Sequence, residues 1–215
     1  MKKIIPFLFL IFLQFSCAST KIYPRIKCQT CVSKSDGILL MPLQWDPSFR
    51  QLSTAQINEL EQLILEIFRE EGFTQVELYD RMEYELLHAG IRDVNDPIQR
   101  ANINLELGIP YLLGLSLGES NWSGNWEAID PDFPEAGTYW EEDTQVSSML
   151  RIALFETAAG DIVSDYAVEA TINGMPIPIG DGETLTLNFG SVIKAVSIAT
   201  RKGIKNLVSD CSCSP

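Results

Sequence analysis

This sequence is poor in the residues on which most enzymes depend. It holds a single histidine, His88, among 215 residues, so a metal site built on paired histidines has no second member. It also lacks a G-x-S-x-G nucleophile motif, a phosphate-binding loop, a dinucleotide-binding glycine motif and the spacing of a calcium loop. His88 is expected late in a helix beside Gly90, as a capping or packing residue. The sequence therefore predicts no enzyme activity, no metal and no cofactor.

Positive charge is also scarce. The chain has 16 Lys and Arg against 29 Asp and Glu, a formal net charge of −13. Nucleic acids and anionic bilayers attract basic surfaces, so this chain binds neither of them through charge. Acidic runs such as Glu141 to Asp143 are interpreted as a solvated acidic face. The less favoured interpretation is a carbohydrate-active enzyme working through Glu127, Asp130, Asp132 or Glu135 beside nearby tryptophans.

Long apolar runs are missing except at the N-terminus. Ile4 to Leu13 form a ten-residue run behind Lys2 and Lys3. The run is too short to cross a bilayer comfortably, since a spanning helix needs about 20 apolar residues. Its length suits the apolar core of an export signal. We therefore predict a signal peptide over residues 1–16.

The residue after this signal, Cys17, is the expected lipid attachment site. A small residue, Ser16, precedes it, and further small residues follow, as in bacterial lipoproteins. Several acyl chains on one residue give stable anchoring, because each buried methylene contributes about 0.8 kcal/mol. Gln14 stands where a lipoprotein signal usually has Leu, and the alternative is an ordinary signal that leaves Cys17 free. Because Ala18 is not the Asp that retains lipoproteins at the inner membrane, we expect palmitate-type anchoring in the outer membrane, on the periplasmic face.

The other four cysteines lie at the two ends of the domain, with none between them. Cys28 and Cys31 are spaced C-x-x-C, and Cys211 and Cys213 are spaced C-x-C. In an oxidising compartment they favour two disulfides, which would tie the leading segment to the tail if the ends lie close together. A four-thiolate zinc site and free or redox-active thiols are the two alternatives.

Hydrophobic periodicity predicts one α/β domain over residues 37–209. Apolar runs and alternating patterns are typical of strands, and apolar residues three and four apart are typical of helices. Strands are expected at residues 37–43, 73–79, 111–117, 147–156 and 162–172, and helices at 53–72, 80–88, 96–107 and 185–208. This order predicts a mixed β-sheet with flanking helices and a long C-terminal helix.

The remaining segments are expected to be irregular. Residues 17–36 are predicted to be a membrane tether, and residues 210–215 a cysteine-containing tail. Residues 119–142 and the Gly- and Pro-containing segment 173–182 are predicted to be loops. Two capping boxes are expected to begin helices, one at Ser53 with Gln56 and one at Asp80 with Glu83.

Aromatic residues gather in the first of these loops. Trp and Tyr dominate binding hot spots, and loops often carry function. The aromatics are candidates for contact with a partner or a glycan, and the alternative is that they pack as a lid on the sheet. They are Trp122, Trp126, Phe133, Tyr139 and Trp140.

Three segments carry a resemblance to a known group. An apolar strand ends in Met41-Pro42-Leu43, a helix leads to the Gly72-Phe73 turn, and Leu107 to Leu115 reads LGIPYLLGL. This resembles the leucine-glycine-x-x-tyrosine-hydrophobic-x-glycine segment of envelope lipoproteins related to the curli-secretion channel lipoprotein. Lipoprotein activators of penicillin-binding proteins and the N-terminal domain of the Tol-system propeller protein share this layout. The resemblance covers residues 37 to 209.

The resemblance implies a non-enzymatic lipoprotein that binds another envelope protein in assembly or regulation. The alternative is an oligomeric subunit of an outer-membrane export complex. Two departures bear on the choice: Pro110 replaces the acidic residue usual before the tyrosine, and no pair of long amphipathic hairpin strands is evident. The second departure argues against a channel.

Overall fold

The computed structural model describes residues 18–45, 52–121, 125–128, 138–141, 145–180, 183–187 and 190–213. The predicted signal peptide and Cys17 lie outside the described residues. So do Trp122 and Phe133 among the aromatic candidates, and the acidic candidates Asp130, Asp132 and Glu135.

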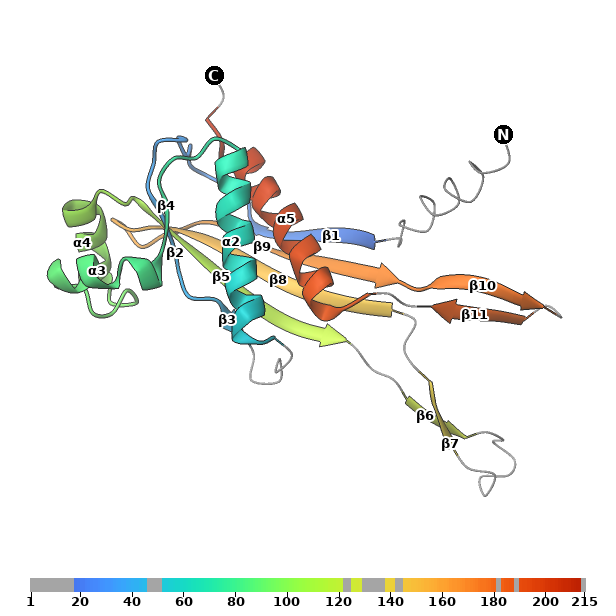
Figure 1. The fold of residues 1–215 in the computed structure, drawn as a ribbon. Coiled ribbons are helices and arrows are strands. Elements are labelled where there is room, and N and C mark those ends of the chain that lie inside the picture. The colour runs from blue at the N-terminus through green and yellow to red at the C-terminus, as the bar shows by residue number, and fades with distance from the viewer. Residues whose placement is uncertain are drawn as a thin grey trace, which may run out of the picture.

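A seven-stranded mixed sheet forms the centre of the domain (Figure 1). Its strands are β1 (Ala18–Ile26), β2 (Ile38–Leu40), β3 (Gln44–Trp45), β4 (Val76–Leu78), β5 (Tyr111–Asn121), β8 (Gln145–Glu156) and β9 (Ile162–Asn173). Six lie in the order β1-β9-β8-β5-β2-β4, and β3 pairs with β5. β2 is parallel to β4 and β5, whereas β1, β9, β8 and β5 are antiparallel neighbours. The predicted α/β class and mixed sheet are confirmed.

Helices cover the two faces of the sheet unequally. The helices are α2 (Thr54–Glu70), α3 (Glu83–His88), α4 (Pro97–Leu107) and α5 (Val192–Cys211), with a 3-10 turn at Tyr79–Arg81. α2 and α5 lie side by side along one face (Figure 1). On the other face α3 and α4 pack over one end only, against Leu39 and Leu112. Among the described residues, therefore, no helix covers much of that second face.

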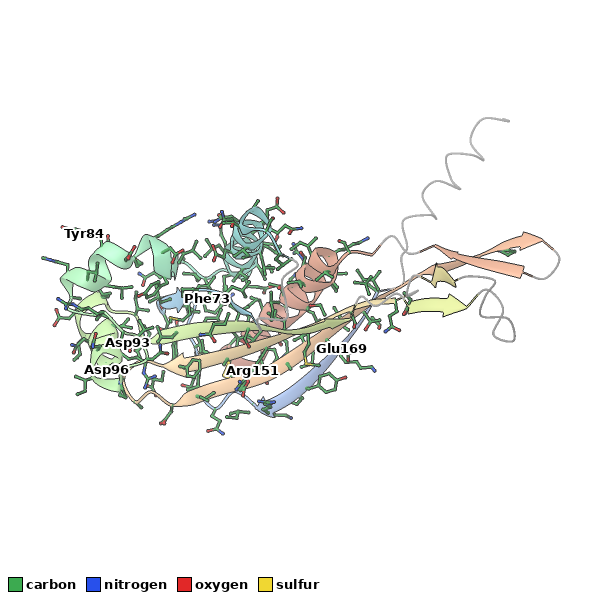
Figure 2. All side chains as sticks on the ribbon, turned by 90° about the horizontal axis from the view of Figure 1, so that it is seen from below. Phe73, Tyr84, Asp93, Asp96, Arg151 and Glu169 are labelled. Carbon is green, nitrogen blue, oxygen red and sulfur yellow. A yellow bond between two sulfur atoms is a disulfide. The ribbon has the colours of Figure 1, made fainter. Side chains whose placement is uncertain are left out.

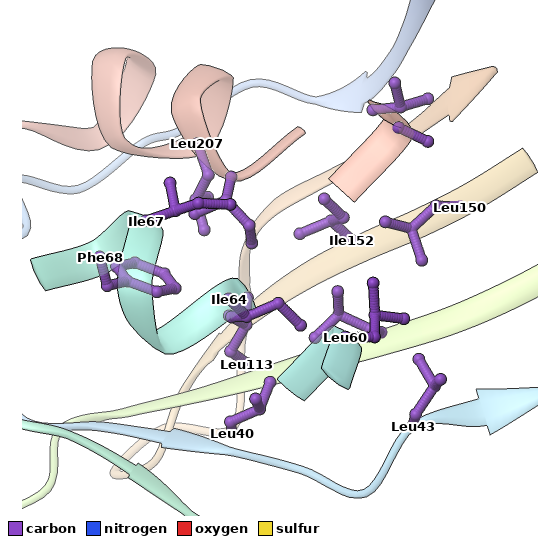
Figure 3. Close-up of a cluster of buried hydrophobic side chains, with 14 of the residues drawn as sticks. Leu40, Leu43, Leu60, Ile64, Ile67, Phe68, Leu113, Leu150, Ile152 and Leu207 are labelled. Atoms are coloured by element: carbon purple, nitrogen blue, oxygen red, sulfur yellow. The ribbon is translucent and has the colours of Figure 1, made fainter. Parts of the chain in front are cut away.

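The main core lies between the sheet and the helices α2 and α5 (Figure 3). Successive strand residues point to opposite faces, so every second residue of β5 and β8 enters this core. Fully burying a Leu, Ile or Phe side chain contributes about 1.5–3 kcal/mol. The buried members include Leu40, Leu60, Ile64, Ile67, Phe68, Leu113, Leu150, Ile152 and Leu207.

Gly203 brings α5 close to the sheet. A Cβ atom at this position would lie 2.3 Å from the end of the Ile152 side chain and 3.2 Å from Val168, so the absence of a side chain allows this close approach of helix and strands. The Tyr166 hydroxyl donates a hydrogen bond to the Gly203 carbonyl oxygen. Burial raises the pKa of Tyr166, which keeps the hydroxyl protonated as a donor.

The two predicted capping boxes have different outcomes. The Ser53 side chain accepts from the Gln56 backbone at 3.3 Å, and Gln56 Oε1 accepts from the Ser53 N–H at 2.9 Å, so this capping box is confirmed. Asp96 caps α4 ahead of Pro97. The box at Asp80 and Glu83 is wrong: Asp80 lies in the 3-10 turn, and the residue before α3 makes no side-chain cap.

The predicted tether over residues 17–36 is corrected by the structure. Ala18–Ile26 form β1, which pairs with β9 over most of its length at the edge of the sheet. Edge strands tolerate polar residues and a proline, because one side of the backbone stays free of ladder bonds. The polar sequence around Pro24 therefore does not exclude a strand. Likewise, Cys211 of the predicted tail belongs to α5.

The two predicted loops contain hairpins. Residues Asn125–Ala128 (β6) pair with Thr138–Glu141 (β7), and Met175–Gly180 (β10) pair with Glu183–Leu187 (β11). The expected helix start at Leu185 is therefore wrong, and α5 begins at Val192 after its cap Ser191. The run Glu-Thr-Leu-Thr-Leu alternates with period two, which suits a strand and not a helix.

Candidate functional site

A groove of about 250 Å³ lies on the face of the sheet opposite α2 and α5. We call it the open-face groove. Its walls come from β5 and β8, from the segments after β2, and from α4 with the segment before it. Its lining residues are Met41, Pro42, Gln44, Val94, Asn95, Arg100, Leu112, Gly114, Leu115, Ser116, Arg151, Ala153 and Phe155.

Small residues on neighbouring strands create the space in this groove. Gly114 pairs with Ala153, and Ser116 pairs with Arg151, across β5 and β8. A Cβ on Gly114 would lie 3.4 Å from the Phe155 ring, in van der Waals contact with it. Larger side chains on these strands would therefore fill the groove.

Arg151 and Asp165 form a forked ion pair at the edge of the groove. Arg151 Nε and Nη2 donate to the two Asp165 oxygens at 2.9 and 2.7 Å. The Asp165 side chain is 5% exposed and that of Arg151 is 44% exposed. The hydrogen bonds to Asp165 raise the pKa of Arg151, while partial burial opposes that shift. Because both oxygens of the buried Asp165 carboxylate accept from the Arg151 guanidinium, the ion pair holds the guanidinium in one orientation.

Arg100 brings a second guanidinium to the groove. It projects from α4, and its tip packs against Gly160, whose φ of +77° places it in the left-handed region. Arg100 Nε is buried, and within the described part of the chain it has no hydrogen-bond partner. Buried donors usually have partners. Arg100 lines the groove together with Asn95 and Ser116, and a guanidinium in such a position can bind a carboxylate or another anionic group.

The face continues beyond the groove toward β1. The Tyr23 hydroxyl donates to Glu169 Oε2 at 2.7 Å, and this bond with the nearby carboxylate charge raises the pKa of Tyr23. Met149 is 38% exposed beside the groove. Figure 2 shows the sheet with α2 and α5 on one side and Arg151 and Glu169 on the other. We call the strip formed by Tyr23, Met149, Arg151 and Glu169, together with the groove, the open face.

The three aromatic candidates among the described residues, Trp126, Tyr139 and Trp140, lie on a hairpin that does not line this groove. In the β6–β7 hairpin, Trp126 is the register partner of Trp140, and Glu127 is the partner of Tyr139. Figure 1 shows this hairpin beyond the end of the main sheet. The chain thus brings two tryptophans into register on one projecting element.

The four cysteines join the two ends of the domain. Cys28 is bonded to Cys211 and Cys31 to Cys213, with Cα atoms 5.3 and 4.8 Å apart. This agrees with the disulfide interpretation of their spacing. Neighbouring bonds support the junction: the Cys28 N–H donates to Asp210 at 3.0 Å, and the Val32 N–H donates to the Cys211 carbonyl at 2.8 Å.

The described residues contain no group of three or more His, Cys, Asp or Glu side chains that could hold a metal ion. His88 lies in the last turn of α3, where its ring stacks on Tyr84 with centroids 6.2 Å apart. None of the helices in the described ranges is long and apolar enough to cross a membrane.

Sequence reasoning did not identify Arg100, Arg151 or Asp165. One signal pointed toward the groove: Gly114 inside an apolar strand indicates close approach of another element. Ser116 and Gly118 continue that pattern on the same face of β5. The arginines carry no comparable signal, because strand register brings Arg151 to this face and the packing of α4 brings Arg100.

Comparisons with known proteins give similarity of fold at low identity. No family model matches the chain, and no curated protein matches it. A PelC dodecamer structure from Paraburkholderia phytofirmans matches with TM-score 0.49 and 9% identity, covering 91% of this chain and 100% of that one. Lipoprotein GNA1162 from Neisseria meningitidis matches with TM-score 0.42 and 11% identity, covering 80% and 99%.

The C-terminal domain of LpoB from Salmonella enterica matches with TM-score 0.34 and 10% identity, over 61% of this chain and 79% of that one. At these scores the similarities carry no functional conclusion.

Proposed function

We propose that this chain is a lipoprotein of the bacterial outer membrane that binds another envelope protein without catalysing a reaction. Residues 1–16 act as the signal peptide, and acylated Cys17 anchors the chain on the periplasmic side. The supporting features are the apolar run behind two lysines and the small residues that flank Cys17. The domain itself supplies a binding surface.

The observation that carries the binding role is the open-face groove. It combines a fixed guanidinium at Arg151, a second arginine at Arg100 and an apolar floor around Leu112 and Phe155. Binding sites commonly combine an apolar surface with a few oriented polar groups. The fitting partner presents a carboxylate, from an acidic side chain or a chain end, beside apolar residues.

The groove does not favour catalysis. A nucleophile needs a base within hydrogen-bond reach, and the groove brings together arginines, amides and Ser116. The carboxylate beside it, Asp165, is engaged by Arg151 through both oxygens. These groups orient an anionic ligand, and binding is the role that they support.

In-cell photocrosslinking tests the binding role. A photoreactive residue replaces Met149 on the open face, and a control replaces the exposed Glu66 on α2, at the opposite face. We expect one envelope protein to be captured from Met149 and not from Glu66, with capture reduced in Arg100→Gln. Equal capture from both positions would refute the proposal that the open face is the binding surface. Capture of a second copy of this chain would support the oligomeric export subunit instead.

Lipid attachment has its own test. Cells fed labelled palmitate should label the chain, and Cys17→Ser should abolish the label and release the protein from the outer-membrane fraction. An unlabelled wild-type chain would refute the anchor while leaving the binding role of the domain untouched.

A further inference from the structure

The proposed anchor stands directly beside the sheet. Ala18 is the first residue of β1, and its Cα partner is Ile172 near the end of β9. Cys17 therefore precedes a paired residue with no spacer, and one residue extends the chain by only about 3.3–3.6 Å. We infer that the domain sits directly on the bilayer, with the β10–β11 hairpin lying on lipid. This inference rests on the proposed lipid at Cys17.

The β10–β11 hairpin leaves the sheet at this same point. β9 ends at Asn173, one residue after the partner of Ala18, and β10 begins at Met175. The β6–β7 hairpin leaves from the same end of the sheet, where Asn121 pairs with Ser147. Both hairpins project beyond the start of β1 (Figure 1). An anchor at Cys17 therefore holds the base of each hairpin near the membrane surface.

The composition of the β10–β11 hairpin suits a lipid surface. Met175 pairs with Leu187, and Ile177 pairs with Leu185. The chain has no Lys or Arg from residue 174 to residue 193. Among the strands that the structure describes, β10 and β11 pair only with each other. A two-stranded hairpin alone in water is marginally stable, so an apolar surface that covers it stabilises it.

Length and charge define how the hairpin lies. Six residues of β10 extend over roughly 20 Å, less than the ~30 Å hydrocarbon core. Glu183 begins β11 and is the register partner of Gly180 at the far end of the hairpin, and charged groups are costly in the bilayer centre. The hairpin therefore lies along the headgroup boundary with its turn at headgroup level. Because the strands carry no basic residue, this contact depends on apolar area and is insensitive to salt.

The experiment is photocrosslinking to lipid in native outer membranes. A photoreactive residue replaces Ile177 in the full chain, and a control replaces Leu87 on α3, which is 54% exposed at the opposite end of the domain. Mass spectrometry then identifies the adducts. We expect phospholipid adducts from Ile177 and none from Leu87, with the Ile177 adduct lost in Cys17→Ser.

The outcomes separate the inference from the proposed function. An acylated, membrane-bound chain that gives no lipid adduct at Ile177, or gives a protein adduct or a crosslinked second copy, overturns the inference alone. A chain without acylation overturns the anchor and the inference together. Equal lipid adducts from Ile177 and Leu87 would show that the domain has no fixed orientation, which also overturns the inference.

Discussion

Removing the two disulfides should cost much more together than the two single removals predict. Cys28–Cys211 and Cys31–Cys213 close loops with sequence separations of 183 and 182 residues. While either bond remains, the unfolded chain is still closed into one large loop. The second bond then restricts only the short ring made by residues 28–31 and 211–213.

The magnitudes follow from loop-closure entropy. Closing a loop of this size should stabilise the fold by about 5 kcal/mol, and closing the short ring by about 2 kcal/mol. Each pair replaced by alanine alone should thus cost about 2 kcal/mol, and both pairs together about 7 kcal/mol. Cys211 is 2% exposed, so its pair should cost about 1 kcal/mol more for lost packing.

Urea unfolding without reductant measures these differences. The variants are Cys28→Ala with Cys211→Ala, Cys31→Ala with Cys213→Ala, and all four together. The fourfold variant should also have a larger slope of free energy against urea, because its unfolded chain exposes more surface. A fourfold cost no greater than the sum of the two pairs would refute the loop-closure reasoning.

Three further predictions concern single contacts. Arg151→Met leaves the buried Asp165 carboxylate unpaired, so we expect a loss of about 1–3 kcal/mol, reduced by half-exposure of the arginine. Chemical unfolding should show a smaller loss when Asp165→Asn is added, and a larger one would contradict the pairing. Tyr166→Phe removes the hydroxyl that donates to Gly203 and should cost about 1–2 kcal/mol in the same assay; unchanged stability would mean that the bond contributes nothing. Hydrogen bonds from the Ile98 N–H and from the Gln99 side chain lower the pKa of Asp96, so its capping contribution is present above the unfolded-state pKa. That contribution is lost as pH falls through the lowered folded-state pKa. Asp96→Asn keeps an acceptor at every pH and should flatten the acid side of the stability curve, whereas identical curves would rule out this role.

Local chemistry explains which parts of the fold were predictable. α2 and α4 begin at capping residues whose side chains accept hydrogen bonds from residues two or three positions later. A short stretch of sequence therefore contains the information that predicts where each helix begins. β1 was missed because an edge strand needs no apolar face pattern and tolerates Pro24. β10 was not predicted because Pro176 and Pro178 are typical of a loop. Proline is nevertheless compatible with a strand that pairs on one side only, as β10 does with β11.

The open-face groove was beyond local reasoning. Its arginines are about fifty positions apart, and they reach one groove only through the pairing of β5 with β8 and the packing of α4. A change of one residue in register would move Arg151 to the core face. The disulfides were easier to predict, because four cysteines confined to two ends of a chain leave few arrangements.

β1 is held at both of its ends, and this has a mechanical consequence. The strand begins beside the proposed anchor and leads to Cys28 and Cys31, which are bonded to Cys211 at the end of α5 and to Cys213 just beyond it. A pulling force that enters at Ala18 runs along the strand and loads its ladder with β9 in shear, so that many hydrogen bonds share it. The covalent junction then passes the remaining tension into α5. The edge strand thus transmits load from the anchor to the folded domain, and this helps the domain resist being pulled from its membrane.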